Sequence, residues 1–256
     1  MLDSSSTGVG TLLSGNASTN VRPLPKWVAV GQKANLSPDD TEIAEKQESK
    51  EAVIIQITLP DSTAAISGGG LSGRYDLSQF HFHWGRNGSL GSEHKIDNET
   101  FQLELHFVHV KNGLTFDEAL KRSDGLAVLS VLYENDDEYF DKRNADGLEL
   151  LENVFSAIED AGKKAHVDDV SGQPFTLSML LPNDTSMFYR YFGSLTTPDC
   201  NEAVVWTVFA DTGRIPSRDL FQFHRVKDLH GHDHIDNYRP VQPLNGRNVS
   251  DTDLTE

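Results

Sequence analysis

Positive charge and long apolar runs are both scarce in this 256-residue sequence. It has 22 Lys and Arg against 39 Asp and Glu, and its formal net charge at pH 7 is −17. Nucleic-acid binding depends on clustered Lys and Arg that neutralise phosphates. The sequence contains no basic stripe, so we expect no nucleic-acid partner. No segment reaches the roughly eighteen consecutive apolar residues of a membrane-spanning helix, so we also expect no membrane span.

Cysteine is nearly absent as well. Cys200 is the one cysteine, so a disulfide within this chain is excluded. The first residues, MLDSSSTGVGTLLSGN, lack the basic start and apolar stretch of a secretory signal, which predicts a cytoplasmic location for the chain as written. Six Asn-x-Ser/Thr sequons point instead to an extracellular ancestry, and the compartment stays open. Their asparagines are Asn16, Asn35, Asn87, Asn98, Asn183 and Asn248.

Composition divides the chain into three parts. Residues 1–50 are rich in Ser, Gly, Asn, Asp and Lys, which predicts a divergent, partly disordered N-terminal segment. Regular apolar patterns fill residues 51–247 and predict one domain, a size that a single β-rich fold can hold. Residues 248–256 are acidic, and we expect them to form a flexible tail.

Strand patterns dominate the middle part, and helical patterns are few and short. Alternation of apolar and polar residues, or a short apolar run, predicts strands at 52–59, 79–84, 101–109, 125–133, 175–181, 187–192 and 203–210. The run 125–133 is apolar throughout, as in a strand buried on both faces. Helices are predicted at 115–122 with an Asx- or Thr-type cap, at 147–161 with an amphipathic stripe, and from a Ser217 cap to His224.

Two of these strands carry histidines with a period of two. In a strand, residues i and i+2 leave by the same face, so Gln79, His81 and His83 point one way. Phe80, Phe82 and Trp84 then point into a core. In the strand 101–109, Gln102, Glu104 and His106 share one face. Neighbouring strands would therefore bring His81, His83 and His106 to one point.

Three neutral imidazoles with a fourth position left open are how a catalytic zinc ion is held, whereas a structural zinc is closed by a fourth protein ligand. A lone strand histidine is more often a hydrogen-bonded core residue than a ligand. The neighbours favour the zinc hypothesis, because a metal-bound imidazole usually donates its second N–H to a fixed acceptor. Gln79 and Glu104 each lie two residues before a histidine on the same face.

Several motifs resemble the α-class carbonic anhydrases, in the order and nearly at the spacing of that family. They are Gln79 to Gly85, Ser92-Glu93-His94, Glu104-Leu105-His106, Gly193 to Pro198 and Tyr238 to Leu244. The resemblance covers roughly residues 52–247, and Cys200 lies where secreted and cell-surface members carry half of a disulfide. It implies an α+β fold dominated by a large, twisted, mostly antiparallel β-sheet with short peripheral helices.

The resemblance also implies an activity, which is reversible hydration of carbon dioxide to bicarbonate and a proton by attack of zinc-bound hydroxide. Zn²⁺ would be bound by His81, His83 and His106, with Gln79, Glu104 and the Asn237 carbonyl behind these histidines. Thr196 and Glu93 would be the catalytic pair that orients the hydroxide, and His94 would be structural. A substrate pocket would be formed by Val108, Val128, Leu195, Thr197, Val204 and Trp206, although the apolar ones fit a plain core equally well. The protein is expected to be a monomer that acts on CO2 and bicarbonate.

Some positions depart from the family pattern. The usual proton-shuttle histidine aligns with Glu51 and a polar cavity asparagine with Ile54, which predicts a slower enzyme, because an imidazole transfers protons well near neutral pH. The alternative is a catalytically weak or silent relative that acts as a binding or matrix protein. The tract His230-Gly231-His232-Asp233-His234 is interpreted as a solvated loop rather than a metal site.

Overall fold

One sheet carries nearly all the regular structure of the described residues. The structure is a computed structural model, and it describes residues 55–58, 64–86, 90–138, 177–225 and 236–252. The strands are β1 (Ile55–Thr58), β2 (Ala65–Ile66), β3 (Tyr75–Trp84), β4 (Leu103–Lys111), β5 (Leu126–Asn135), β6 (Phe188–Gly193), β7 (Val204–Phe209), β8 (Gly213–Ile215) and β9 (Ser250–Asp251). The helices are α2 (Phe116–Ala119), the 3₁₀ turn η2 (Leu177–Leu180) and α5 (Ser217–His224). Within these ranges, no helix has the length and apolar character needed to cross a membrane.

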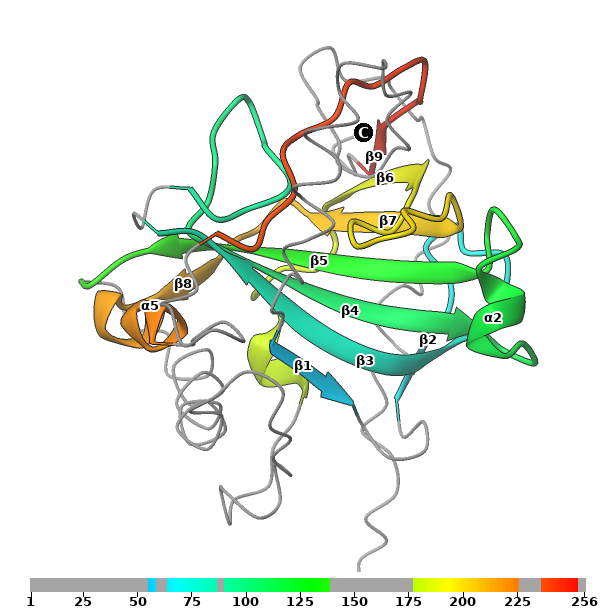
Figure 1. Cartoon of the computed structure of the whole chain (residues 1–256), viewed down its shortest axis with the longest axis horizontal. Coiled ribbons are helices and arrows are strands. Elements are labelled where there is room, and N and C mark those ends of the chain that lie inside the picture. Colours follow the sequence, from blue (N-terminus) through cyan, green and yellow to red (C-terminus); the bar gives the residue numbers. More distant parts are fainter. Residues whose placement is uncertain (1–54, 59–63, 87–89, 139–176, 226–235, 253–256) are drawn as a thin grey trace, which may run out of the picture.

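The nine strands form one mixed sheet in the order β1-β3-β4-β5-β7-β6-β9, with β2 beside β3 and β8 beside β5. All pairs are antiparallel except β5 with β7 and β5 with β8. Figure 1 shows the long strands β3, β4 and β5 side by side across the molecule, with α2 and α5 near opposite ends of the sheet. The predicted α+β class, with a large and mostly antiparallel sheet and short peripheral helices, is confirmed.

A β-bulge in β3 decides which residues face the histidine side of the sheet. The pairing with β4 runs from Tyr75 opposite Lys111 to Leu77 opposite His109, and then shifts so that Gln79 lies opposite Val108. Ser78 is therefore the extra residue. Because one extra residue exchanges the two faces of a strand, Leu77 lies in one core, while His81 and His83 point to the other side.

Each face of the sheet packs its own apolar cluster. One cluster contains Phe80, Phe82, Trp84 and the odd-numbered apolar residues of β4 and β5, such as Leu105 and Val131. The second contains Val108, Val128, Val204, Trp206 and Tyr191. The strand β5 contributes to both and is buried along Leu126–Tyr133, as its continuous apolar run predicts. The histidines lie on the face of the second cluster.

Two local predictions are wrong. The segment predicted as a strand at 175–181 contains the 3₁₀ turn Leu177–Leu180. Leu177, Leu180 and Leu181 follow a helical spacing, and a short apolar run does not separate the two cases. Ser217 is the first residue of α5 and not its cap. Pro216 occupies the cap position without a side-chain hydrogen bond, and the Asp137 carboxylate accepts from Ser217 N at 2.7 Å instead.

The other helix predictions have different outcomes. Thr115 caps α2 with a capping box, in which Thr115 Oγ1 accepts from Glu118 N and Glu118 Oε2 accepts from Thr115 N. The amphipathic helix predicted at 147–161 and the N-terminal segment 1–50 lie outside the described residues. Val249 is buried and Ser250–Asp251 pair with β6, so the sheet includes residues within the stretch 248–256, where we predict a tail.

Candidate metal centre

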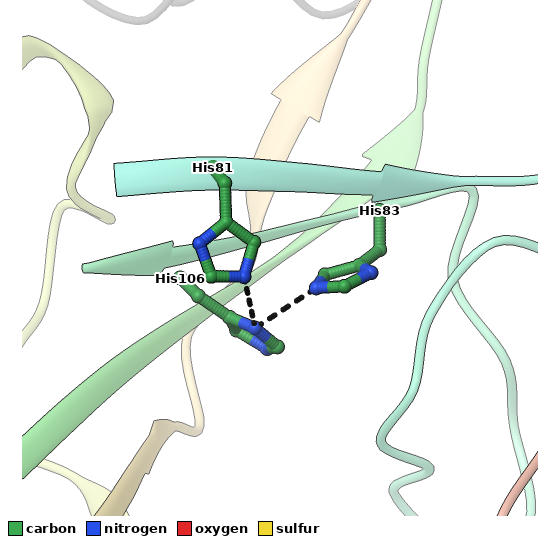
Figure 2. Close-up of side chains that lie close together, drawn as sticks. All are labelled: His81, His83 and His106. Atoms are coloured by element: carbon green, nitrogen blue, oxygen red, sulfur yellow. Dashed lines mark hydrogen bonds between the residues drawn. The ribbon is translucent and has the colours of Figure 1, made fainter. Parts of the chain in front are cut away.

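Three imidazoles from β3 and β4 meet on one face of the sheet. His81 lies directly opposite His106 in the β3–β4 register, and His83 is two residues further along β3. Figure 2 shows the three rings pointing toward one another, two from β3 and one from β4. His106 Nδ1 lies 3.1 Å from His83 Nε2 and 3.3 Å from His81 Nε2. All three side chains are buried.

Each ring binds a fixed acceptor through its other nitrogen. His81 Nδ1 donates to Gln79 Oε1 at 2.8 Å, His83 Nδ1 to the Asn237 carbonyl at 3.0 Å, and His106 Nε2 to Glu104 Oε1 at 2.6 Å. A neutral imidazole carries one proton, so these bonds leave a bare lone pair on each of the three facing nitrogens. Three lone pairs that meet at one point repel one another, and a cation between them would remove that repulsion.

The spacing of these nitrogens fits zinc. Zn–N bonds of about 2.0–2.1 Å in a tetrahedral arrangement hold ligand nitrogens roughly 3.3 Å apart, close to the two observed separations. Burial lowers the pKa of each of the three histidines below the ordinary value, so all three are neutral at pH 7, the form in which an imidazole can bind a metal ion. Gln79, Glu104 and Asn237 each lie where the sequence predicts an outer partner of a histidine.

Glu104 is the hydrogen-bond hub beneath the site. Its Oε2 accepts from the backbone N–H groups of Glu93 and His94, at 2.7 and 2.8 Å. Its Oε1 accepts from His106, from His94 Nδ1 at 2.5 Å and from Ser130 Oγ at 2.7 Å. Burial alone raises the pKa of Glu104, but the interactions with His94 and His106 outweigh it, and the net pKa lies well below the ordinary value. Glu104 is therefore an ionised carboxylate that fixes the His106 ring.

Ser130 and Tyr191 belong to this network, and the sequence analysis missed both. Ser130 is the one polar residue in the buried stretch Leu126–Tyr133 of β5, a signal that could have identified it. Tyr191 donates its hydroxyl hydrogen to His94 Nε2 at 2.7 Å, and nothing in its strand pattern indicates that contact. His94 is held from both sides by Glu104 and Tyr191, in keeping with the structural place predicted for it.

Glu93 lies beside the histidines and is almost fully buried. Its Oε1 accepts from Arg239 N at 2.7 Å and lies 3.4 Å from His83 Nδ1. Burial raises the pKa of Glu93 to about 7, and the contacts that oppose this rise are His106, Arg239 N and, most weakly, the Thr196 side chain. Glu93 Oε2 has no partner of ordinary hydrogen-bond geometry, so the contact with Thr196 is long or poorly aligned. The structure thus brings the predicted pair close together.

The predicted pocket residues lie together on the histidine face. Val108, Val128, Val204 and Trp206 belong to one buried cluster, and Leu195 packs against it. The Trp206 ring lies 4.8 Å from the His106 ring, centre to centre. Thr197 is half-buried beside Thr196. An apolar wall thus adjoins the polar site. Glu51, Ile54 and the tract 230–234 lie outside the described residues.

Comparison with known proteins relates the chain to one family. Residues 30–253 match the model of the eukaryotic-type carbonic anhydrases. The chain is 44% identical over 194 residues to putative carbonic anhydrase 5 of Caenorhabditis elegans. It is 37% identical over 197 residues to carbonic anhydrase 7 and 39% identical over 198 residues to carbonic anhydrase 15, both of Mus musculus.

These alignments cover most of this chain but less of the relatives. They include 72%, 74% and 73% of the chain, respectively, and 56%, 69% and 57% of the three relatives. The chain thus spans little more than half the length of two of the relatives it matches.

Proposed function

Because the chain belongs to the eukaryotic-type carbonic anhydrase family, we propose that it catalyses the reversible, zinc-dependent hydration of CO2 to bicarbonate and a proton. One observation carries the proposal. Three histidine nitrogens with bare lone pairs meet at zinc spacing, and each ring is fixed by an acceptor on its far side. Three protein ligands leave a fourth position for solvent or substrate, which is the arrangement of a catalytic zinc.

His81, His83 and His106 hold the zinc in this proposal. When bound, zinc acts as a Lewis acid that lowers the pKa of coordinated water from ~15.7 to about 7 and so supplies a nucleophile at neutral pH. The outer partners keep each imidazole in the tautomer that presents its lone pair. Glu104 adds negative charge behind His106 and makes that ring a better donor to the metal.

Glu93 and Thr196 orient the nucleophile. An ionised Glu93 accepts the hydroxyl hydrogen of Thr196, so that the Thr196 oxygen is left to accept a hydrogen bond from solvent at the site. The fixed bond from Arg239 N holds Glu93 in place. Thr196 then accepts only from a solvent species whose remaining lone pair faces the substrate. The backbone N–H of Thr196 donates to an anionic oxygen, and Thr197 binds water at the rim.

The apolar residues beside the histidines provide the place for CO2. Val108, Val128 and Val204 are buried, and Trp206 and Leu195 complete the wall. CO2 has no net dipole, so it gains from an apolar surface that excludes competing water. Bicarbonate is charged, and the same surface favours its release.

CO2 hydration measured together with zinc content tests this proposal. Stopped-flow assays of the wild-type protein should show turnover that chelation abolishes and added zinc restores. His81→Ala should lose at least about a hundredfold in turnover, because two imidazoles do not hold a catalytic zinc. His224→Ala is the control, since His224 lies on α5 and contacts the Gly85 carbonyl at 3.0 Å, away from the three histidines. Stoichiometric zinc without CO2 turnover would favour the silent binding protein.

A further inference from the structure

On the sheet face opposite the histidines, Arg190 of β6 has hydrogen-bonding capacity that the described residues do not use. Its Nε donates to Thr207 Oγ1 at 3.1 Å on the neighbouring strand. Its Nη2 is buried and has no hydrogen-bond acceptor in the part of the chain that the structure describes. A guanidinium has five N–H donors, so this buried donor needs a partner that the packing does not supply.

Arg190 also lacks a carboxylate partner among the residues that the structure describes. The ion pairs of the described residues include none with Arg190, and its guanidinium carbon lies 5.1 Å from the centre of the Phe188 ring. Burial lowers the pKa of Arg190 to about 10, and Tyr75 is the one group that opposes this shift. The side chain therefore remains a cation at pH 7. Burying a cation without an anion is costly.

A glycine loop lies against this guanidinium. Gly68, Gly69 and Gly70 all have positive φ, at 84°, 52° and 80°, a conformation that glycine adopts without strain. A Cβ built on Gly70 would meet Arg190 Nη1 at 3.8 Å and no other atom of the described residues within 4 Å. The described residues thus leave space beside Gly70 and the guanidinium. Among the described residues, the N–H groups of Gly69 and Gly70 have no acceptor.

We propose that Arg190 and the Gly68–Gly70 loop bind a small oxyanion, such as inorganic phosphate. A guanidinium edge and backbone N–H groups in a glycine turn are the donors that oxyanions accept from in proteins. The site does not depend on the CO2 chemistry, because Arg190 shares its sheet face with Thr207 and Phe188 and not with the histidines.

Two charged pairs of the described residues lie near the loop and leave the charge of Arg190 uncompensated. Lys111 Nζ lies 2.5 Å from Asp124 Oδ2, and Arg74 Nε lies 2.8 Å from Asp76 Oδ1. These two pairs are neutral overall, and Arg190 remains. In a chain of net charge −17, this is an unusual place for an anion to be attracted, and binding should weaken as salt rises.

Titration of ¹⁵N-labelled full-length protein with inorganic phosphate, at constant ionic strength and pH 7, tests the site. The amide resonances of Gly68, Gly69 and Gly70 should shift and saturate with a midpoint on the order of millimolar, as expected for a few charge-assisted hydrogen bonds. Arg190→Gln should raise the midpoint at least about tenfold. Arg74→Gln removes an exposed guanidinium nearby and should leave the midpoint within about twofold.

Two results would overturn the site. One is a glycine shift that is absent or never saturates, and the other is an equal titration of the wild-type protein and Arg190→Gln. Circular dichroism establishes that each variant is folded. If Arg190→Gln does not fold, Arg190→Lys is used to test the phosphate site. It keeps the charge without the planar fork and should raise the midpoint about threefold or more, and an unchanged midpoint contradicts the proposal.

Discussion

Glu93 is the residue whose protonation most directly links this site to stability. Burial raises its pKa to about 7 from an ordinary value of 4.5. Between these two values the folded state binds a proton that the unfolded state has lost, so the contribution of Glu93 to folding stability falls as pH rises. The loss of unfolding free energy that comes from ionising the buried Glu93 is complete above the folded pKa and absent below pH 4.5. A bound cation would offset it, because it favours the ionised carboxylate.

The first prediction concerns Glu93→Gln in protein freed of metal by chelation. Relative to wild type, the variant should gain about 3 kcal/mol of unfolding free energy between pH 4.5 and pH 8, at about 1.4 kcal/mol per pKa unit. Urea unfolding at several pH values measures this. The buried histidines are neutral when folded, so their contribution to the unfolding free energy changes with pH in the direction opposite to that of Glu93. Both proteins contain these histidines, so the comparison cancels their contribution. A difference that does not change with pH would show that Glu93 does not titrate in this range.

The second prediction concerns Ser130, whose hydroxyl donates to Glu104 at 2.7 Å in a fully buried position. Ser130→Ala should reduce unfolding free energy by about 1–2 kcal/mol and speed zinc loss to a chelator about threefold to tenfold, since outer partners of ligands tune metal affinity. Thr207→Val is the control, because it removes a buried hydroxyl on the opposite face. If both variants release zinc at the same rate, Ser130 serves packing alone.

For single residues, the sequence predicts well which side chains gather around the three histidines. The period of two places His81 with His83, and Gln79 and Glu104 two residues before a histidine, and the structure brings all of them together. The sequence does not predict the contacts of Ser130 and Tyr191. These residues lie on β5 and β6, and no local spacing shows which strands are neighbours. The Asn237 carbonyl, 154 residues from His83, is expected only through the family resemblance.

In the strand β3, one extra residue decides which side chains point to which face of the sheet. Ser78 is the extra residue of its bulge, and it exchanges the faces between Leu77 and Gln79. The alternation at 79–84 predicts correctly which residues share a face. It does not predict the bulge, because Tyr75 and Leu77 continue an apolar alternation of their own. A bulge is visible only when two strands are paired.

The third prediction is the deletion of Ser78. Without the extra residue, either His81 and His83 turn into the apolar core or Tyr75 and Leu77 turn out of it. We expect loss of zinc binding and a loss of more than about 4 kcal/mol in unfolding free energy, in the range of severe core defects. Zinc content and a thermal melt measure both. Ser78→Ala keeps the chain length and should bind zinc normally, whereas normal zinc binding by the deletion variant would contradict the assigned role of the bulge.

The helix ends show a similar limit of sequence reasoning. Thr115 and Glu118 are three residues apart, and their capping box is predictable from that spacing alone. The N-terminus of α5 is served by Asp137, 80 residues away from Ser217, which no local pattern reveals. The turn at 177–180 has a length at which strand and helix patterns coincide.

For the whole molecule, the proposed CO2 hydration would require that a proton leave the buried site for bulk solvent. The family resemblance predicts Glu51 at the position of the usual shuttle histidine, and a glutamate has too low an ordinary pKa to accept protons efficiently near neutral pH. The fourth prediction is that CO2 turnover at pH 7.5 rises several-fold when millimolar imidazole buffer is added. Stopped-flow rates at constant ionic strength measure this. A turnover that does not respond to imidazole would mean that another group of the chain carries the proton.

The order and direction of the strands in the sheet are also only partly predictable from the sequence. The class of fold follows from the strand patterns together with the family motifs. The two parallel pairings of β5, with β7 and β8, join segments about 80 residues apart, and the sequence contains no signal for such a crossover. The short strands β2, β8 and β9 have two or three residues each, too few for any period to be seen.

Zinc K-edge X-ray absorption of the purified protein would test directly whether three histidines bind zinc. We expect one zinc per chain, with three imidazole nitrogens and one oxygen at about 2.0–2.1 Å and no sulfur. His106→Ala should abolish that spectrum. A sulfur scatterer near about 2.3 Å, which would implicate Cys200, or an unchanged zinc site in His106→Ala, would contradict it.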